Sequence, residues 1–156
     1  MFIISNNDKR KDIGRLFAEF KQGSTQAALS LLANYNVSIE QAGSDLDCAA
    51  YVCKALDLPG DSQRLIDLIA QSRNEVISMN LVKKGEDCIA RYFDANGQFK
   101  HAALYIGDNL FQSKWTLDFL VTHPLENLPF YFGQEVCLYN VNDFVRAQAQ
   151  RLILEQ

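Results

Sequence analysis

The sequence predicts an α+β fold in which N-terminal helices pack on an antiparallel sheet of about 4–6 strands. Apolar residues recur at helical spacing in the first half of the chain, whereas short apolar and aromatic runs separated by tight turns fill the second half. Helices that precede a meander of strands are typical of α+β proteins, with the helices on one side of the sheet. A length of 156 residues and a hydrophobic fraction of 48% indicate one domain, residues 1–156.

The N-terminal third is expected to be helical. Residues 10–34 show the helical repeat, broken at Gly23, and a second helical run covers 27–32. Ser24 or Thr25 is expected to cap this second run, since a hydroxyl oxygen can accept a hydrogen bond from the first free backbone N–H groups.

A further helix is expected to begin at Cys48. The segment 43–47 contains turn-forming residues and ends on Asp47, whose carboxylate suits a helix N-terminus. Helix-forming residues continue to Leu56, and the run 58–60, Leu-Pro-Gly, predicts the end of the helix. Residues 61–79 are expected to form another helix.

The second half reads as strands and turns. Asn96-Gly97 and Gly107-Asp108 are turn signals, because Gly, Asn and Asp tolerate positive φ. Residues 117–132, which are aromatic and contain two prolines, are expected to be irregular, and 142–154 to form a closing helix. The expected strands are 88–93, 99–106, 110–115 and 135–139.

Composition excludes several classes of function. The net charge is −4 and basic residues do not cluster, so we expect no nucleic-acid partner; Lys9, Arg10 and Lys11 are read as a solvated face. No apolar run reaches the roughly 18 residues needed to span a bilayer, and the N-terminus lacks the pattern of a secretory signal. We therefore expect a protein that is cytoplasmic as synthesised, or exported without a cleaved signal peptide, and that does not act at a membrane.

Cys48 is the candidate nucleophile and His101 the candidate base. A cysteine at the start of a helix is exposed to backbone N–H dipoles that favour the thiolate, and a histidine that opens a strand can supply the proton transfer. The other three cysteines are expected to be core thiols, and their spacing fits neither a zinc site nor a disulfide scaffold. We therefore expect no metal and no cofactor. His123, which precedes Pro124, is expected to be a loop residue and not the base.

Three segments resemble NlpC/P60-type cysteine peptidases. Residues 47–52, Asp-Cys-Ala-Ala-Tyr-Val, resemble the Asp-Cys-Ser-Gly-hydrophobic-Val segment at the nucleophile of that family, with Ala-Ala in place of Ser-Gly. Residues 84–90 look like the Pro-Gly-Asp-hydrophobic segment that begins a strand, and 101–109 are similar to the His-Val-Gly-Ile-Tyr-Ile-Gly-Asn hairpin that carries the base. The resemblance covers about residues 43–115.

The resemblance implies a papain-like fold with Cys48 as nucleophile and His101 as general base. It also implies a third polar residue, on the strand after the hairpin, that orients the imidazole. An ungapped count places Ser113 there, and a shift of one residue in the turn places Gln112 there, whose amide oxygen is the better acceptor.

The reaction class implied is hydrolysis of an amide bond. The leading substrate is a peptidoglycan stem peptide, cleaved by a wall amidase or endopeptidase or by an effector toxin with an immunity or secretion partner protein. One alternative is a protein glutamine deamidase or protease effector. The other is a catalytically degenerate binding module, motivated by the departures around Cys48.

Overall fold

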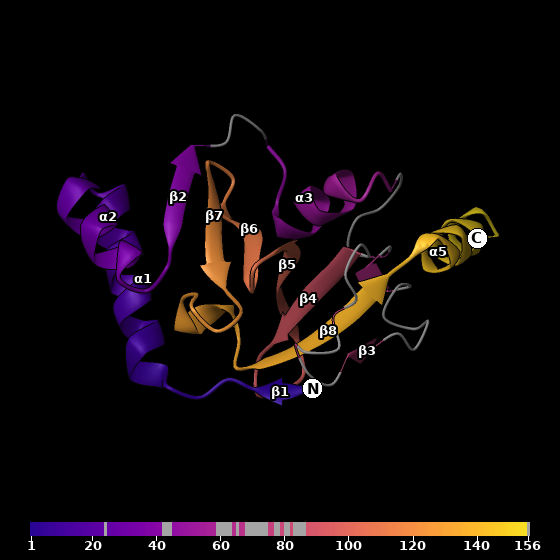
Figure 1. Cartoon of the computed structure of the whole chain (residues 1–156), viewed down its shortest axis with the longest axis horizontal. Helices are drawn as coiled ribbons and strands as arrows, with labels where there is room; N and C mark the ends of the chain where they lie inside the picture. Colours follow the sequence, from indigo (N-terminus) through magenta and orange to yellow (C-terminus); the bar gives the residue numbers. More distant parts are fainter. Residues whose placement is uncertain are drawn as a thin grey trace.

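The computed structural model describes most of the chain (Figure 1). The described residues are 1–23, 25–41, 45–58, 64, 66–67, 75–76, 79, 82 and 87–155. Two expectations fall largely or wholly outside these residues: the helix expected over 61–79 and the stop at Pro59-Gly60. Of the NlpC/P60-like segment 84–90, residues 84–86 lie outside them.

The N-terminal third forms two helices, as predicted. Helix α1 (Asn7–Lys21) begins after Asn6, whose side chain accepts a hydrogen bond from the Lys9 backbone N–H. Helix α2 (Thr25–Ala33) follows a break at Gln22 and Gly23. The break falls where Gly23 adopts a φ of +107°, which a residue with a side chain rarely takes.

Helix α3 (Cys48–Ala55) begins at the residue predicted from the sequence. Asp47 lies just before it in extended conformation, and its carboxylate accepts a hydrogen bond of 2.8 Å from the Ala50 N–H. This satisfies one of the free donors of the first turn and places a negative charge at the positive end of the helix.

One antiparallel sheet dominates the fold, and the α+β class is confirmed. In the described part of the chain it has eight strands, more than the 4–6 expected, in the order β1-β8-β4-β5-β6-β7-β2, with β3 pairing alongside β8. The strands are β1 (Phe2–Ile3), β2 (Ser38–Gln41), β3 (Glu75–Val76), β4 (Asp87–Phe93), β5 (Phe99–Gly107), β6 (Leu110–Thr116), β7 (Phe119–Pro124) and β8 (Glu135–Val141).

The expectation of an irregular segment over 117–132 was wrong for its first half. Residues Phe119 to Pro124 form β7, paired with both β6 and β2. Val121 and His123 are fully buried and Thr122 between them is not, which is the alternation of a strand. The proline does not interrupt the ladder because it is the last residue of the strand. A short 3₁₀ helix, η2 (Phe130–Phe132), follows.

The two faces of the sheet are covered by different helices, contrary to the expectation that the helices share one side. The α1 face carries a core that includes Phe17 of α1 together with Tyr92, Ala103 and Phe111. The α3 face carries a second core, in which Val52 of α3 meets residues of β4, β5 and β8. Neighbouring residues on a strand alternate between these cores. In Figure 1, α3 lies over the middle strands and α1 and α2 lie beyond β2.

Arg10 corrects a second expectation, because it is fully buried and not part of a solvated face. Its guanidinium donates hydrogen bonds of 3.0 Å to the carbonyl oxygens of Leu128 and Pro129. The two bonds hold α1 against the segment that leads into η2, so this arginine is a packing residue of the α1 face.

Helix α5 (Asp143–Leu154) closes the chain as expected. Asn142 caps it by accepting a hydrogen bond of 2.9 Å from the Val145 N–H. Arg146 then joins the helix to the Leu56 carbonyl and to the Asp87 carboxylate. None of the helices in the described residues is long and apolar enough to cross a membrane.

Candidate functional site on the α3 face

Cys48 lies at the first residue of α3 and is partly buried. Burial raises the pKa of its thiol above the ordinary value, and the charge of Asp47 acts in the same direction. Backbone hydrogen bonds from Ala102, Ala49 and Cys48 itself oppose the shift without reversing it. A thiol with a raised pKa stays protonated near pH 7, so the helix start does not produce a thiolate here.

His101 lies on the α1 face of the sheet. It pairs with Tyr92 across β4 and β5, and its ring stacks on Phe132 with 4.1 Å between the ring centroids. It is 1% exposed, and burial followed by the nearby His123 lowers its pKa well below the usual range. Its Nε2 atom is buried and has no hydrogen-bond partner among the described residues. This imidazole is neutral and faces an aromatic core.

The structure therefore does not bring Cys48 and His101 together. Ala102, the residue next to His101, belongs to the core of the α3 face and its backbone binds the Cys48 sulfur. Adjacent strand residues point to opposite faces, so His101 points away from α3. The assignment of this pair as nucleophile and base stays a prediction from the sequence.

The two candidates for the third residue are also divided between the faces. Gln112 pairs with Leu104 of the α3-face core, and its Oε1 accepts a hydrogen bond of 2.8 Å from the Tyr51 hydroxyl. Ser113 is fully buried on the α1 face beside His123. Gln112 thus shares a face with Cys48, and Ser113 shares a face with His101.

His123 corrects the expectation of a loop residue, since it is a fully buried member of β7. Its Nδ1 lies 2.7 Å from the Pro124 carbonyl oxygen, which can only accept, so the proton is on Nδ1. The Nε2 atom then accepts the hydrogen bond of 2.8 Å from the Ser113 hydroxyl, and Ser113 accepts from Trp115 Nε1 at 3.1 Å. Burial lowers the pKa of His123 to about 4.

This serine and histidine are hydrogen-bonded like a nucleophile and its base, but a substrate has no access to them. Both side chains are 0% exposed, and aromatic rings surround them. No substrate carbonyl can reach the Ser113 hydroxyl in this arrangement. We assign the trio of Ser113, Trp115 and His123 to the internal packing of the α1 face.

A row of polar side chains crosses the α3 face, and its only signal in the sequence is the helical spacing of Cys48 and Tyr51. Tyr51 lies one turn after Cys48 and donates to Gln112. Gln112 Nε2 in turn donates to the Thr122 hydroxyl at 3.4 Å. The row joins α3 to β6 and β7, and it ends at a pocket.

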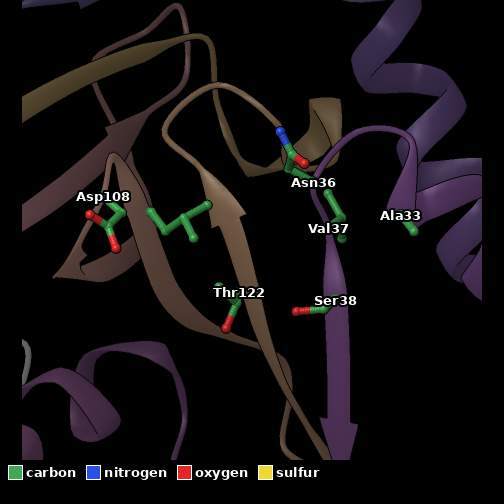
Figure 2. A pocket seen from close by; sticks show the side chains of 7 residues that line it. Ala33, Asn36, Val37, Ser38, Asp108 and Thr122 are labelled. Atoms are coloured by element: carbon green, nitrogen blue, oxygen red, sulfur yellow. The ribbon is translucent and has the colours of Figure 1, made fainter.

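The pocket has a volume of about 430 Å³ and lies where β6, β7 and β2 meet the end of α2. Figure 2 shows Thr122 and Ser38 on neighbouring strands, Asp108 on the turn before β6, and Asn36 on the connection from α2. Its described lining residues are Ala33, Asn36, Val37, Ser38, Asp108, Leu110 and Thr122. Thr122 belongs both to this lining and to the polar row.

Within the described residues, no three histidine, cysteine or acidic side chains gather as a metal-ion site. The comparisons with known proteins give one result. A family model described as Domain of unknown function (DUF7689) matches residues 41–140, which include α3, the polar row and strands β4 to β7. No curated protein and no solved structure matches the chain.

Proposed function

The chain belongs to the family described as Domain of unknown function (DUF7689), and we propose that it is a binding module: it keeps a papain-like, NlpC/P60-type arrangement, but the cysteine of that arrangement is not a nucleophile. The ligand surface is the α3 face. One observation carries this proposal: Cys48 and His101 point to opposite faces of the sheet.

Catalysis by a thiol requires a thiolate and a base that can exchange a proton with it. Cys48 has a raised pKa, and His101 has a lowered pKa on the other side of the sheet. Both shifts favour the neutral forms, whereas an activated pair needs the thiolate beside an imidazolium. The electrostatics and the geometry therefore support the same conclusion.

The polar row supports a binding role. Tyr51, Gln112 and Thr122 are joined by hydrogen bonds, so their donors and acceptors are held in place before any ligand arrives. Preorganised polar groups beside an open pocket reduce the entropy that binding costs.

Alkylation of Cys48 tests the proposal. Iodoacetamide at pH 6 is expected to label Cys48 slowly, because a thiol with a raised pKa is almost wholly protonated there. Cys53, Cys88 and Cys137 are buried, so labelled peptides report on Cys48 first. In separate samples of unalkylated protein, soluble peptidoglycan fragments are expected to release no new amines. Rapid labelling at pH 6, or amine release that a Cys48→Ser variant loses, contradicts the proposal.

A second candidate is amide hydrolysis by Cys48, and the backbone hydrogen bonds of Ala102, Ala49 and Cys48 itself to the Cys48 sulfur favour it. Such donors can stabilise an oxyanion. The substrate would be a peptidoglycan stem peptide or, for a deamidase or protease effector, a partner protein. Release of amines from peptidoglycan fragments would identify a wall hydrolase. A mass gain of about one dalton on a candidate partner protein, which reports the change of an amide to an acid, would identify a deamidase.

A further inference from the structure

We infer that the pocket between β6, β7 and β2 binds a small polar ligand through a protonated amine. This inference deepens the proposed function and rests on it, because it names the ligand chemistry of the same face. The observation behind it is a carboxylate, Asp108, at the rim of a pocket whose other described polar lining residues, Asn36, Ser38 and Thr122, carry amide and hydroxyl oxygens.

Charge selects a cation at this pocket. Asp108 is the one charged residue among the described lining residues, and no ion pair within the described chain involves it. On β6 itself the register places the basic residue Lys114 on the same face, level with Leu120 and therefore with Glu40 of β2. It lies four residues along β6 from Leu110, which is about 13 Å. The carboxylate at the pocket end is thus left for a ligand.

The acceptors around the pocket are held by local structure. Asp108 adopts a φ of 55° in the turn between β5 and β6, and the Tyr105 hydroxyl accepts a hydrogen bond of 3.2 Å from the next backbone N–H, that of Asn109. Asn36 adopts a φ of 57° at the end of the α2 connection. Thr122 is fixed by its bond from Gln112. An ammonium group has three donors and no acceptor, which matches a site of oxygen acceptors.

The size of the pocket limits the ligand. A volume of about 430 Å³ admits an amino acid side chain or one sugar ring. Leu110 and Val37 supply the apolar part of the lining, against which the carbon body of such a ligand packs. An amino sugar and a lysine side chain share this chemistry, so the experiment has an arm for each.

The test uses the full chain labelled with ¹⁵N and four probes, titrated while amide shifts are recorded. Glucosamine is compared with glucose, and N-acetyl-lysine methylamide with N-acetyl-norleucine methylamide, so that each pair differs in the amine. We expect at least one amine probe to shift the amides of Ser38, Asp108 and Thr122 with a Kd of about 1 mM, and its neutral partner to bind at least about fivefold more weakly. The amine probe that binds, glucosamine or N-acetyl-lysine methylamide, shows whether the ligand is an amino sugar or a lysine side chain.

Asp108→Asn removes the charge and keeps the shape, and asparagine tolerates the same positive φ. It is expected to weaken the amine probe about fivefold, the upper end for an exposed ion pair. Asp57→Asn is the matched control, because Asp57 is also exposed with a φ of 57° and lies beyond the C-terminus of α3. It should leave the affinity unchanged.

Two results overturn the inference: neither amine probe binds more tightly than its neutral partner, or Asp108→Asn binds the amine as tightly as the original chain. Failure of the proposed function is a separate result, since it is detected by rapid alkylation of Cys48 or by amine release. Protein alkylated at Cys48 is expected to bind the amine probe unchanged, because Cys48 is not among the residues lining the pocket.

Discussion

Replacing His123 by glutamine removes one buried titrating group from the α1 face. The pKa of His123 is lowered from 6.5 to about 4, first by burial and also by the charge of Arg10, against the opposing hydrogen bond to Pro124. This difference corresponds to ~3 kcal/mol. Because the folded pKa lies below the unfolded one, the unfolded chain binds the extra proton between about pH 4 and pH 6.5, so stability falls as the pH is lowered through that window.

The assay is urea unfolding of the original chain and of His123→Gln at several values between pH 7 and pH 5. Over this range His123 is expected to cost the folded state about 2 kcal/mol, so the original chain loses that much more stability than the variant. The carboxylates are present in both proteins and cancel in the comparison. His101 cancels in its larger part, because burial is the main cause of its lowered pKa and the charge of His123 the smaller one. The variant itself is expected to be less stable at pH 7 by roughly 1–3 kcal/mol, since the Ser113 and Trp115 bonds are disturbed. Equal loss of stability in both proteins would refute the reasoning.

Three further substitutions test the packing by thermal or urea unfolding. Gly133→Ala should cost roughly 3 kcal/mol of stability, because φ is +113° and the new Cβ would lie 2.6 Å from the Phe93 carbonyl oxygen. The control Gly97→Ala, at φ +77° with open space around it, should cost only about 1 kcal/mol. Equal costs would contradict the close approach of Gly133 to Phe93. Arg10→Met should cost about 2 kcal/mol, as two buried carbonyl groups lose their donors, and a change under about 0.5 kcal/mol would contradict that role. His101→Phe keeps the stacking on Phe132 and removes the unpartnered Nε2, so stability at pH 7 should hold or rise; a loss above about 2 kcal/mol would show that the imidazole has a partner.

Local chemistry made several elements predictable. The start of α3 depends on Asp47 and the three residues after it, all adjacent in the chain. The turns at Gly97 and Gly107 depend on positive φ, and glycine is the residue type that adopts positive φ most readily. Asn142 caps α5 for the same local reason. These features required no knowledge of the rest of the fold.

The face on which His101 lies could not be read from the sequence. Residues 101–103 are all buried, because both faces of β5 are covered, so no polar and apolar alternation marks the side that faces α3. A one-residue change in register would turn the histidine to the other face. The register is irregular after Tyr92, where Phe93 pairs with Phe99, and such a bulge has no reliable signature.

Long-range partners account for the other errors. Arg10 sits among charged neighbours, and the carbonyl groups it binds lie 118 and 119 residues away. The pocket likewise joins the end of α2 to β6 and β7, which only the sheet order β6-β7-β2 brings together. Residue types near Cys48 suggested a reactive cysteine, but its pKa depends on burial, which the spacing of residues does not reveal.

The pH dependence of Cys48 alkylation, compared between the original chain and His101→Phe, tests the central claim most directly. Labelling of the Cys48 peptide by iodoacetamide would be followed by mass spectrometry from pH 6 to pH 10. We expect both proteins to show the same curve, with a midpoint above the ordinary thiol pKa of about 8.5, because burial raises the pKa of Cys48 and His101 lies on the other face. Rapid alkylation at pH 6 that the His101 variant loses would show that the two residues form a catalytic pair, and it would contradict this account.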